Sequence, residues 1–141
     1  MSFTVTEQTT ELILPSRIEA VAEAAQAAAQ FISSVGLGEE IAFGVDMAVR
    51  EAVTNAVLHG NKQELAKMVE VTLLNTTSAL EITVRDHGTG FDPGSVPDPT
   101  DPQNLMKTSG RGILFMRTFM DEVQWLRHDE GGTVVRMIKR H

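Results

Sequence analysis

Two polar side chains one helical turn apart, Glu51 and Asn55, are the first residues of this sequence whose types and spacing could do chemistry. They lie in the stretch EAVTNAVLHGN, where apolar residues recur at near-helical spacing, so both project from the same face of a predicted helix. A carboxylate can take up a proton, and a carboxamide oxygen can bind a hard cation. A solvated helix face is the ordinary alternative, because Glu is a good helix former and exposed polar residues are common.

A second group of candidate residues follows a predicted strand in the stretch VRDHGTGF. Asp86 stands where the strand ends, and Gly88 and Gly90 bracket one residue behind it. Glycines allow the backbone to turn sharply and to approach a flat or bulky ligand closely. Without other signals, a tight turn with a capping Asp is the simpler interpretation.

A third group opens an apolar helix in the stretch TSGRGILF, where Ser109, Gly110 and Gly112 stand at the helix start. The unpaired N–H groups and the dipole at a helix N-terminus favour an anion such as a phosphate. A capped helix is the alternative. Taken together, the three groups could supply a metal ligand, a reader of a base and a phosphate cradle. The usual nucleotide motifs are absent, since neither GxxxxGK(S/T) nor GxGxxG after the first strand occurs.

Length and composition predict one soluble domain over residues 1–141. The chain contains no cysteine, which excludes disulfides and thiolate metal sites, and its formal net charge of -7 opposes binding to nucleic acid. The N-terminus lacks both a basic start and a sustained apolar run, and no later segment is long enough to cross a bilayer. We therefore expect a cytoplasmic protein without direct nucleic-acid or membrane partners.

Local patterns predict the elements that must position these residues. A strand, or two short ones, covers Phe3 to Leu14 at a sheet edge. An Ala-rich helix follows from Ser16 to about Val35, with Ser16 as its N-cap and Gly36 as its stop. A second helix follows the segment GLGEE and runs to roughly His59, where Gly60 ends it.

The second half of the chain contains two predicted hairpins with a helix between them. The stretch GILFMRTFM predicts the helix, and EVQWLRH and GGTVVRMIKR predict the later hairpin. A Pro-rich loop at about 92–109, of a length typical of a lid or a linker, precedes this helix. Alternating runs around NTTSA predict the earlier hairpin, in which Val69, Val71 and Leu73 share one face and Leu80, Ile82 and Val84 share another.

This order of elements predicts an α/β fold, a two-layer sandwich. A mixed, mostly antiparallel sheet would carry the helices on one face, because the pattern is neither a strict alternation of strands and helices nor all-β. Met116, Met120 and Trp125 are interpreted as packing residues. His59 and His87 show no metal-binding spacing, so we expect His59 to pack at a helix end and His87 to be simply exposed.

The three groups of residues, in this order and spacing, resemble the motifs of a known superfamily. EAVTNAVLHGN, DHGTGFDP and GRGILFMRTFMDEV are similar to the N box and the two glycine boxes of the Bergerat-fold (GHKL) ATP-binding superfamily, which includes gyrase and histidine kinases. The length of the chain and the residues of its motifs resemble those of the superfamily's anti-sigma-factor serine/threonine kinases of the RsbW and SpoIIAB type. The resemblance spans nearly the whole chain. At Asn61 the sequence has HGN where these kinases commonly have HGY, a change expected to spare the Mg2+ chemistry and to alter lid contacts.

The resemblance implies a role for each residue of the first two groups. Asn55 would coordinate Mg2+ through its side-chain oxygen, and Glu51 would be the general base that takes the proton from an attacking hydroxyl or water. Asp86 would accept a hydrogen bond from the adenine amino group, which selects ATP over GTP. Gly88 and Gly90 would let the chain pass close to the base.

The resemblance also implies how the phosphates are held. Gly110 and Gly112 would cradle them, while Arg111 or Lys107 would neutralise their charge. Thr133 matches a position near adenine, although a Thr in a strand is ordinarily structural.

The function implied by the resemblance is that of an ATP-dependent protein serine/threonine kinase, an anti-sigma regulator that phosphorylates a STAS-type anti-sigma antagonist and sequesters a sigma factor. ATP and Mg2+ would be its cofactors, and a homodimer its assembly. The alternative is a non-catalytic ATP-binding switch that binds a protein partner, for which a base at Glu51 has no use. The catalytic domain of a sensor histidine kinase fits less well, since His59 and His87 are each followed by Gly.

Overall fold

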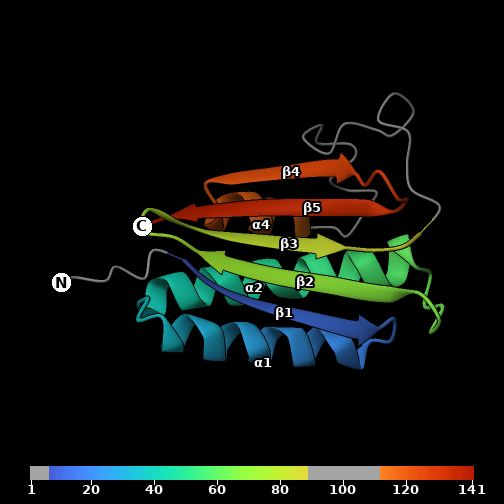
Figure 1. Cartoon of the computed structure of the whole chain (residues 1–141), viewed down its shortest axis with the longest axis horizontal. Helices are drawn as coiled ribbons and strands as arrows, with labels where there is room; N and C mark the ends of the chain where they lie inside the picture. The colour runs from blue at the N-terminus through green and yellow to red at the C-terminus, as the bar shows by residue number, and fades with distance from the viewer. Residues whose placement is uncertain (1–6, 89–111) are drawn as a thin grey trace.

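The computed structural model describes residues 7–88 and 112–141 (Figure 1). Its sheet has five strands in the order β1-β2-β3-β5-β4, and every neighbouring pair is antiparallel. No helix within these two ranges has the length and apolar character to cross a membrane. In chain order the elements are β1 (Gln8–Pro15), α1 (Glu19–Ser34), α2 (Glu39–Asn55), the π-helical turn η1 (Ala56–Gly60), β2 (Met68–Asn75), β3 (Ala79–Arg85), α4 (Gly112–Phe119), β4 (Glu122–Arg127) and β5 (Thr133–Arg140).

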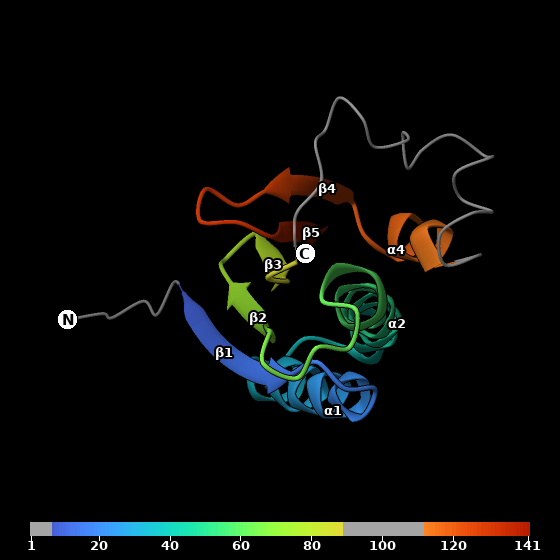
Figure 2. The same cartoon turned by 90° about the vertical axis from the view of Figure 1, so that its right-hand side faces the viewer.

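Helices α1, α2 and α4 cover one face of the sheet, with α2 between the other two (Figure 2). This confirms the predicted two-layer α/β fold. Both apolar sets of the first hairpin lie on the helix-covered face rather than on two faces, because the register pairs Leu73 with Ile82 and Val71 with Val84. The residues concerned, Val69, Val71, Leu73, Leu80, Ile82 and Val84, are at most 1% exposed.

The first helix is shorter at its start than the sequence predicted. Ser16 is fully buried and donates its hydroxyl to the carbonyl oxygen of Lys67, so it does not cap the helix, which begins at Glu19. The predicted stop is confirmed. Gly36 has a φ of 77°, and its N–H together with that of Leu37 binds carbonyl oxygens of the last helical turn at 3.2 Å. Glycine adopts this left-handed conformation without steric cost.

The second helix changes its winding before it ends. It was predicted to run uninterrupted to His59, but the α-helix stops at Asn55 and continues as the π-helical turn η1 up to Gly60. The N–H of Asn61 then binds the carbonyl oxygen of Ala56 at 2.8 Å, five residues earlier. His59 lies exposed on this turn rather than packed at a helix end. Such π-helical turns occur frequently at functional sites.

Helix α4 packs closely along α2. A Cβ atom on Gly44 would lie 3.1 Å from Cβ of Phe119, so the absence of a side chain there allows the two helices to approach. Met116 and Met120 are buried, as predicted for core residues. Trp125 is half-buried beneath the guanidinium of Arg117, whose central carbon lies 5.6 Å from the ring centroid. The predicted packing role of Trp125 agrees with this position.

The one-sided layering can be tested with neighbouring leucines of β2 that face opposite ways. Leu73→Ala is expected to lower the free energy of unfolding by about 2–5 kcal/mol, because it opens a cavity beneath the helices. Leu74→Ala removes a side chain from the face of the sheet opposite the helices. It should lower the free energy of unfolding by about 1 kcal/mol or less, which is the contribution of a cross-strand pair. Denaturant titration of both variants measures the difference. Equal losses would contradict the layering.

Candidate functional site

Asp86 lies directly after β3, where its carboxylate joins two strands. The residue is 7% exposed, and its Oδ1 accepts hydrogen bonds from the backbone N–H of Gly88 at 3.0 Å and of Thr133 at 3.2 Å. The N–H of Asp86 donates in turn to the carbonyl oxygen of Thr133 at 3.0 Å. The structure therefore places Asp86, Gly88 and Thr133 together, and Thr133 makes these contacts through its backbone.

Three glycines allow other segments to close in on Asp86. A Cβ atom on Gly60 would lie 2.2 Å from Asp86 Oδ2, and one on Gly132 would lie 1.9 Å from the carbonyl oxygen of Asp86. A Cβ atom on Gly88 would lie 2.1 Å from the carbonyl oxygen of Gly60. Gly60 had been assigned only to the end of a helix, and Gly132 only to the stretch GGTVVRMIKR of the later hairpin. The glycine pair in DEGGTV was the available signal for Gly132, whose φ is 88°.

Asn55 ends α2 with an oxygen that lacks a protein partner. Its Oδ1 atom is buried and accepts no hydrogen bond from the residues that the structure describes. A buried polar atom without a partner costs about 1–3 kcal/mol, so an oxygen in this state fits a ligand that supplies the missing contact. A hard cation such as Mg2+ takes such oxygens and keeps several waters and phosphate oxygens as its other ligands. Asn55 therefore fits the predicted metal role.

The described residues offer no alternative metal centre. Within residues 7–88 and 112–141, no three His, Cys, Asp or Glu side chains gather closely enough to hold an ion. A cation at Asn55 would thus depend on phosphate oxygens and waters for most of its coordination, which is the usual arrangement for Mg2+ bound with a nucleotide.

Glu51 lies one helical turn before Asn55 on α2 and is partly buried. Burial raises the pKa of its carboxyl above the ordinary value of 4.5, because desolvation disfavours the charged form. A carboxylate whose pKa moves toward neutrality becomes a better match for a general base. The predicted pair therefore combines a carboxyl of raised pKa with an unpartnered amide oxygen.

Asn61 was missed as a structural residue. It was expected to affect the lid, which lies outside the described residues, yet its side chain is fully buried in the fold. The amide nitrogen contacts Ser16 Oγ at 2.7 Å, and the amide oxygen accepts the N–H of His87 at 2.7 Å. The partners are 45 and 26 residues away in the chain, so no local spacing could have indicated them.

His87 is not simply exposed, as had been predicted. Its Nε2 lies 2.5 Å from Oε2 of Glu70, and the guanidinium of Arg85 lies 3.5 Å from the same oxygen. The side chain of His87 is 37% exposed. These contacts hold His87, which follows β3, against Glu70 of β2 on the face of the sheet opposite the helices.

The phosphate side of the predicted site lies largely outside the described residues. Gly90, Lys107, Gly110 and Arg111 all fall in the range 89–111, and Gly112 is the first residue of α4. Their predicted roles stay predictions.

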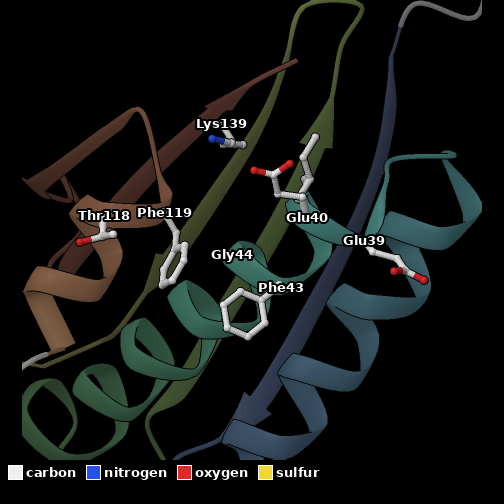
Figure 3. A pocket seen from close by; sticks show the side chains of 8 residues that line it. Glu39, Glu40, Phe43, Gly44, Thr118, Phe119 and Lys139 are labelled. Carbon is white, nitrogen blue, oxygen red and sulfur yellow. The ribbon is translucent and has the colours of Figure 1, made fainter.

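A separate pocket lies at the far end of α2. Its volume is about 430 Å³, and it is lined by the first turns of α2, the end of α4 and Lys139 of β5 (Figure 3). Phe43 meets Phe119 edge-on there, with ring centroids 5.4 Å apart. Gly44 is the lining residue of α2 nearest to Asn55 in the chain, and it lies about 16 Å before Asn55 along the helix at about 1.5 Å per residue. It contains none of the predicted site residues, so we do not assign the chemistry to it.

Residues 14–139 match the family of histidine kinase-like ATPase domains. The chain belongs to this family. Its membership confirms the resemblance to the GHKL superfamily and supports ATP as a ligand of this domain.

Relatives of the chain narrow the type of ATPase domain. An anti-sigma F factor of Anoxybacillus flavithermus is 32% identical over 99 residues, which cover 67% of this chain and 66% of that protein. One of Bacillus thuringiensis is 30% identical over 115 residues, covering 79% and 77%. A crystal structure of the RsbU and RsbW domains of a Mycobacterium tuberculosis protein shares the fold, with a TM-score of 0.68 at 17% identity, over 94% of this chain and 32% of that one. The chain is therefore of the anti-sigma-factor kinase type.

The raised pKa of Glu51 predicts how this ATPase domain responds to pH. Because its folded-state pKa lies above that of the unfolded chain, the contribution of Glu51 to stability is fully present below the unfolded pKa and is lost as the pH rises through the folded pKa. Glu51→Gln is neutral at every pH and escapes this loss. We expect the variant to match the native unfolding midpoint at pH 4 and to exceed it at pH 7.

Thermal unfolding at several pH values measures this difference. Glu39→Gln, in the exposed first turn of the same helix, controls for the removal of a carboxylate. A Glu51→Gln variant that is less stable than the native protein at pH 7 would contradict the burial argument.

Proposed function

We propose that the protein is an ATP-dependent protein serine/threonine kinase and an anti-sigma regulator of transcription. The observation that carries the proposal is the pairing, on one face of α2, of the raised-pKa carboxyl of Glu51 with the unpartnered oxygen of Asn55. A domain that only binds ATP needs no base beside its metal ligand. The names of the relatives support the regulatory role.

Asp86 would recognise the adenine ring. A carboxylate can accept about four hydrogen bonds, and Oδ1 of Asp86 takes two from backbone amides. Lone pairs therefore remain for the exocyclic amino group of adenine, whereas guanine presents an oxygen in that place. Gly88, which leaves no side chain over the turn, would let the ring lie close to the backbone, as would Gly90. Thr133 would stand beside the ring.

The phosphates would extend from Asp86 toward Asn55. Asn55 would hold Mg2+, which supplies charge neutralisation to the phosphate oxygens when bound. Gly110 and Gly112 would cradle the phosphates with backbone N–H groups, and Lys107 or Arg111 would add positive charge.

Glu51 would act as the general base of the transfer. The hydroxyl oxygen of a substrate Ser or Thr attacks the γ-phosphorus, the bond to the β-phosphate oxygen breaks, and ADP leaves. The hydroxyl proton goes to the carboxylate of Glu51. Positioned proton transfer of this kind contributes about 10^2 to 10^4 in rate. The raised pKa brings Glu51 closer to the ideal value for this step.

The partners follow from the same proposal. A STAS-type antagonist would be the protein that is phosphorylated, and a sigma factor would be the protein that is sequestered. A homodimer of single domains in the cytoplasm is the proposed working form. The net charge of -7 suits protein partners better than nucleic acid.

Phosphoryl transfer tests this function directly. Native protein with labelled ATP, Mg2+ and candidate STAS-domain proteins is expected to label one of them on Ser or Thr. Glu51→Gln should slow transfer by about 10^2- to 10^4-fold while ATP affinity stays within about threefold, because only the base is lost. Glu39→Gln is the matched control on the same helix and should transfer at the native rate.

The two other outcomes are equally informative. Undiminished transfer by Glu51→Gln would remove Glu51 from its role as base. ATP binding without transfer to any candidate would instead favour the non-catalytic switch.

A further inference from the structure

We propose that Asn61 is a positioning residue for adenine recognition, because it holds the turn that carries Asp86 and Gly88 in place. Its amide oxygen accepts the backbone N–H of His87, the residue between those two, at 2.7 Å. The proposal rests on the proposed function as an ATP-binding kinase and names a residue that controls its nucleotide site.

The side chain of Asn61 is built into the fold with all its polar atoms in use. It is 0% exposed, and its Nδ2 contacts Ser16 Oγ at 2.7 Å, the carbonyl oxygen of Lys67 at 3.1 Å and that of Met68 at 3.0 Å. Buried hydrogen bonds of this kind specify one arrangement, since any displacement leaves a polar atom without a partner.

The orientation of the amide follows from its partners. Carbonyl oxygens cannot donate, so the group facing Lys67 and Met68 must be the NH2; a backbone N–H cannot accept, so the group facing His87 must be the oxygen. One amide side chain meets both demands. An Asp would face two carbonyls with an oxygen, and an apolar residue would leave the buried carbonyls and the His87 N–H unpaired.

Asn61 also links the adenine turn to the end of η1. The adjacent residue, Gly60, carries the carbonyl oxygen against which Gly88 packs and the Cα against which the Asp86 carboxylate packs. The contacts of Gly60 and the hydrogen bond of Asn61 thus hold both sides of the same turn. If Asn61 loses its partners, we expect the turn that carries Asp86 and Gly88 to shift.

The two ends of the Asn61 amide make contacts with different consequences, one for the stability of the fold and one for the proposed nucleotide site. The nitrogen end ties η1 to Ser16 at the end of β1 and to the start of β2, which concerns stability. The oxygen end ties η1 to His87, which concerns the turn. Ser16→Ala therefore serves as a matched control, because it damages the same buried network but leaves the His87 hydrogen bond in place.

Amide hydrogen exchange of the nucleotide-free protein tests the contact itself. Asn61→Ala is expected to speed exchange of the His87 N–H at least tenfold relative to the change seen across β3, and Ser16→Ala should not. Unchanged protection of His87 in Asn61→Ala would overturn the proposal without involving ATP.

Nucleotide binding then tests the consequence. Asn61→Ala should raise the Kd for ATP about tenfold or more and bring the ratio of GTP to ATP affinity toward one, while Ser16→Ala keeps the native ratio. Phosphoryl transfer at saturating ATP should stay near the native rate, since Glu51 and Asn55 lie on α2 and not on the turn. An equal loss of ATP affinity in both variants would overturn the positioning role.

A backbone ester in place of the His87 amide gives a second route if Asn61→Ala does not fold. The ester removes the N–H donor, weakens the Asp86 carbonyl oxygen as an acceptor and leaves the buried contacts of the Asn61 nitrogen intact, and it should reproduce the loss of ATP selectivity. Native ATP binding by the ester protein would overturn the positioning role alone. Failure of the native protein to bind ATP would overturn the proposed function together with it.

Discussion

A nearly buried carboxylate at the end of β3 is the constraint on which the site depends. Burial of the Asp86 side chain would be costly without partners, and the N–H groups of Gly88 and Thr133 supply them. The surrounding backbone comes very close to Asp86: Gly60 faces its carboxylate and Gly132 faces its backbone carbonyl oxygen, each without a side chain. The end of β3, the start of β5 and the end of η1 are therefore held in one arrangement by one acidic group.

The change of helical winding after Asn55 connects that carboxylate to the proposed catalytic pair. Helix α2 presents Glu51 and Asn55 on one face, and the five residues of η1 then carry the chain from Asn55 to Gly60 beneath Asp86. The pair is not optimised for stability: burial opposes the charge of Glu51, and Asn55 Oδ1 lacks a partner among the described residues. Local departures from a stabilising arrangement are expected where a ligand completes the contacts.

Local sequence patterns predicted much of the fold and part of the site. The alternating apolar runs of β2 and β3 predicted a hairpin correctly, and Gly36 predicted the end of α1, because both signals depend on neighbouring residues. The side of the sheet on which each set lies depends on register and layering, and there the prediction was wrong. For the site, the structure places Asp86, Gly88 and Thr133 together, and the adenine-binding roles that the motif resemblance implies for them stay predictions.

What the sequence did not predict depends on distant partners. Ser16 was expected to cap a helix, yet it bonds Lys67 across 51 residues, and Asn61 reaches both Ser16 and His87. His87 was expected to be exposed but contacts Glu70 on β2. Composition and spacing do not indicate such pairs, because these contacts form only after the sheet has folded. The π-helical turn escaped prediction for a related reason, since its sequence also suits a regular helix.

Calorimetric titration of native protein and Asp86→Asn with ATP and with GTP, both with Mg2+, tests the central claim most directly. If Asp86 reads the adenine amino group, native protein binds ATP in preference to GTP, and Asp86→Asn loses about 1.5 to 3 kcal/mol of ATP binding free energy, or about one to two decades in Kd. Equal affinity of the native protein for ATP and GTP, or unchanged ATP affinity in Asp86→Asn, would contradict it.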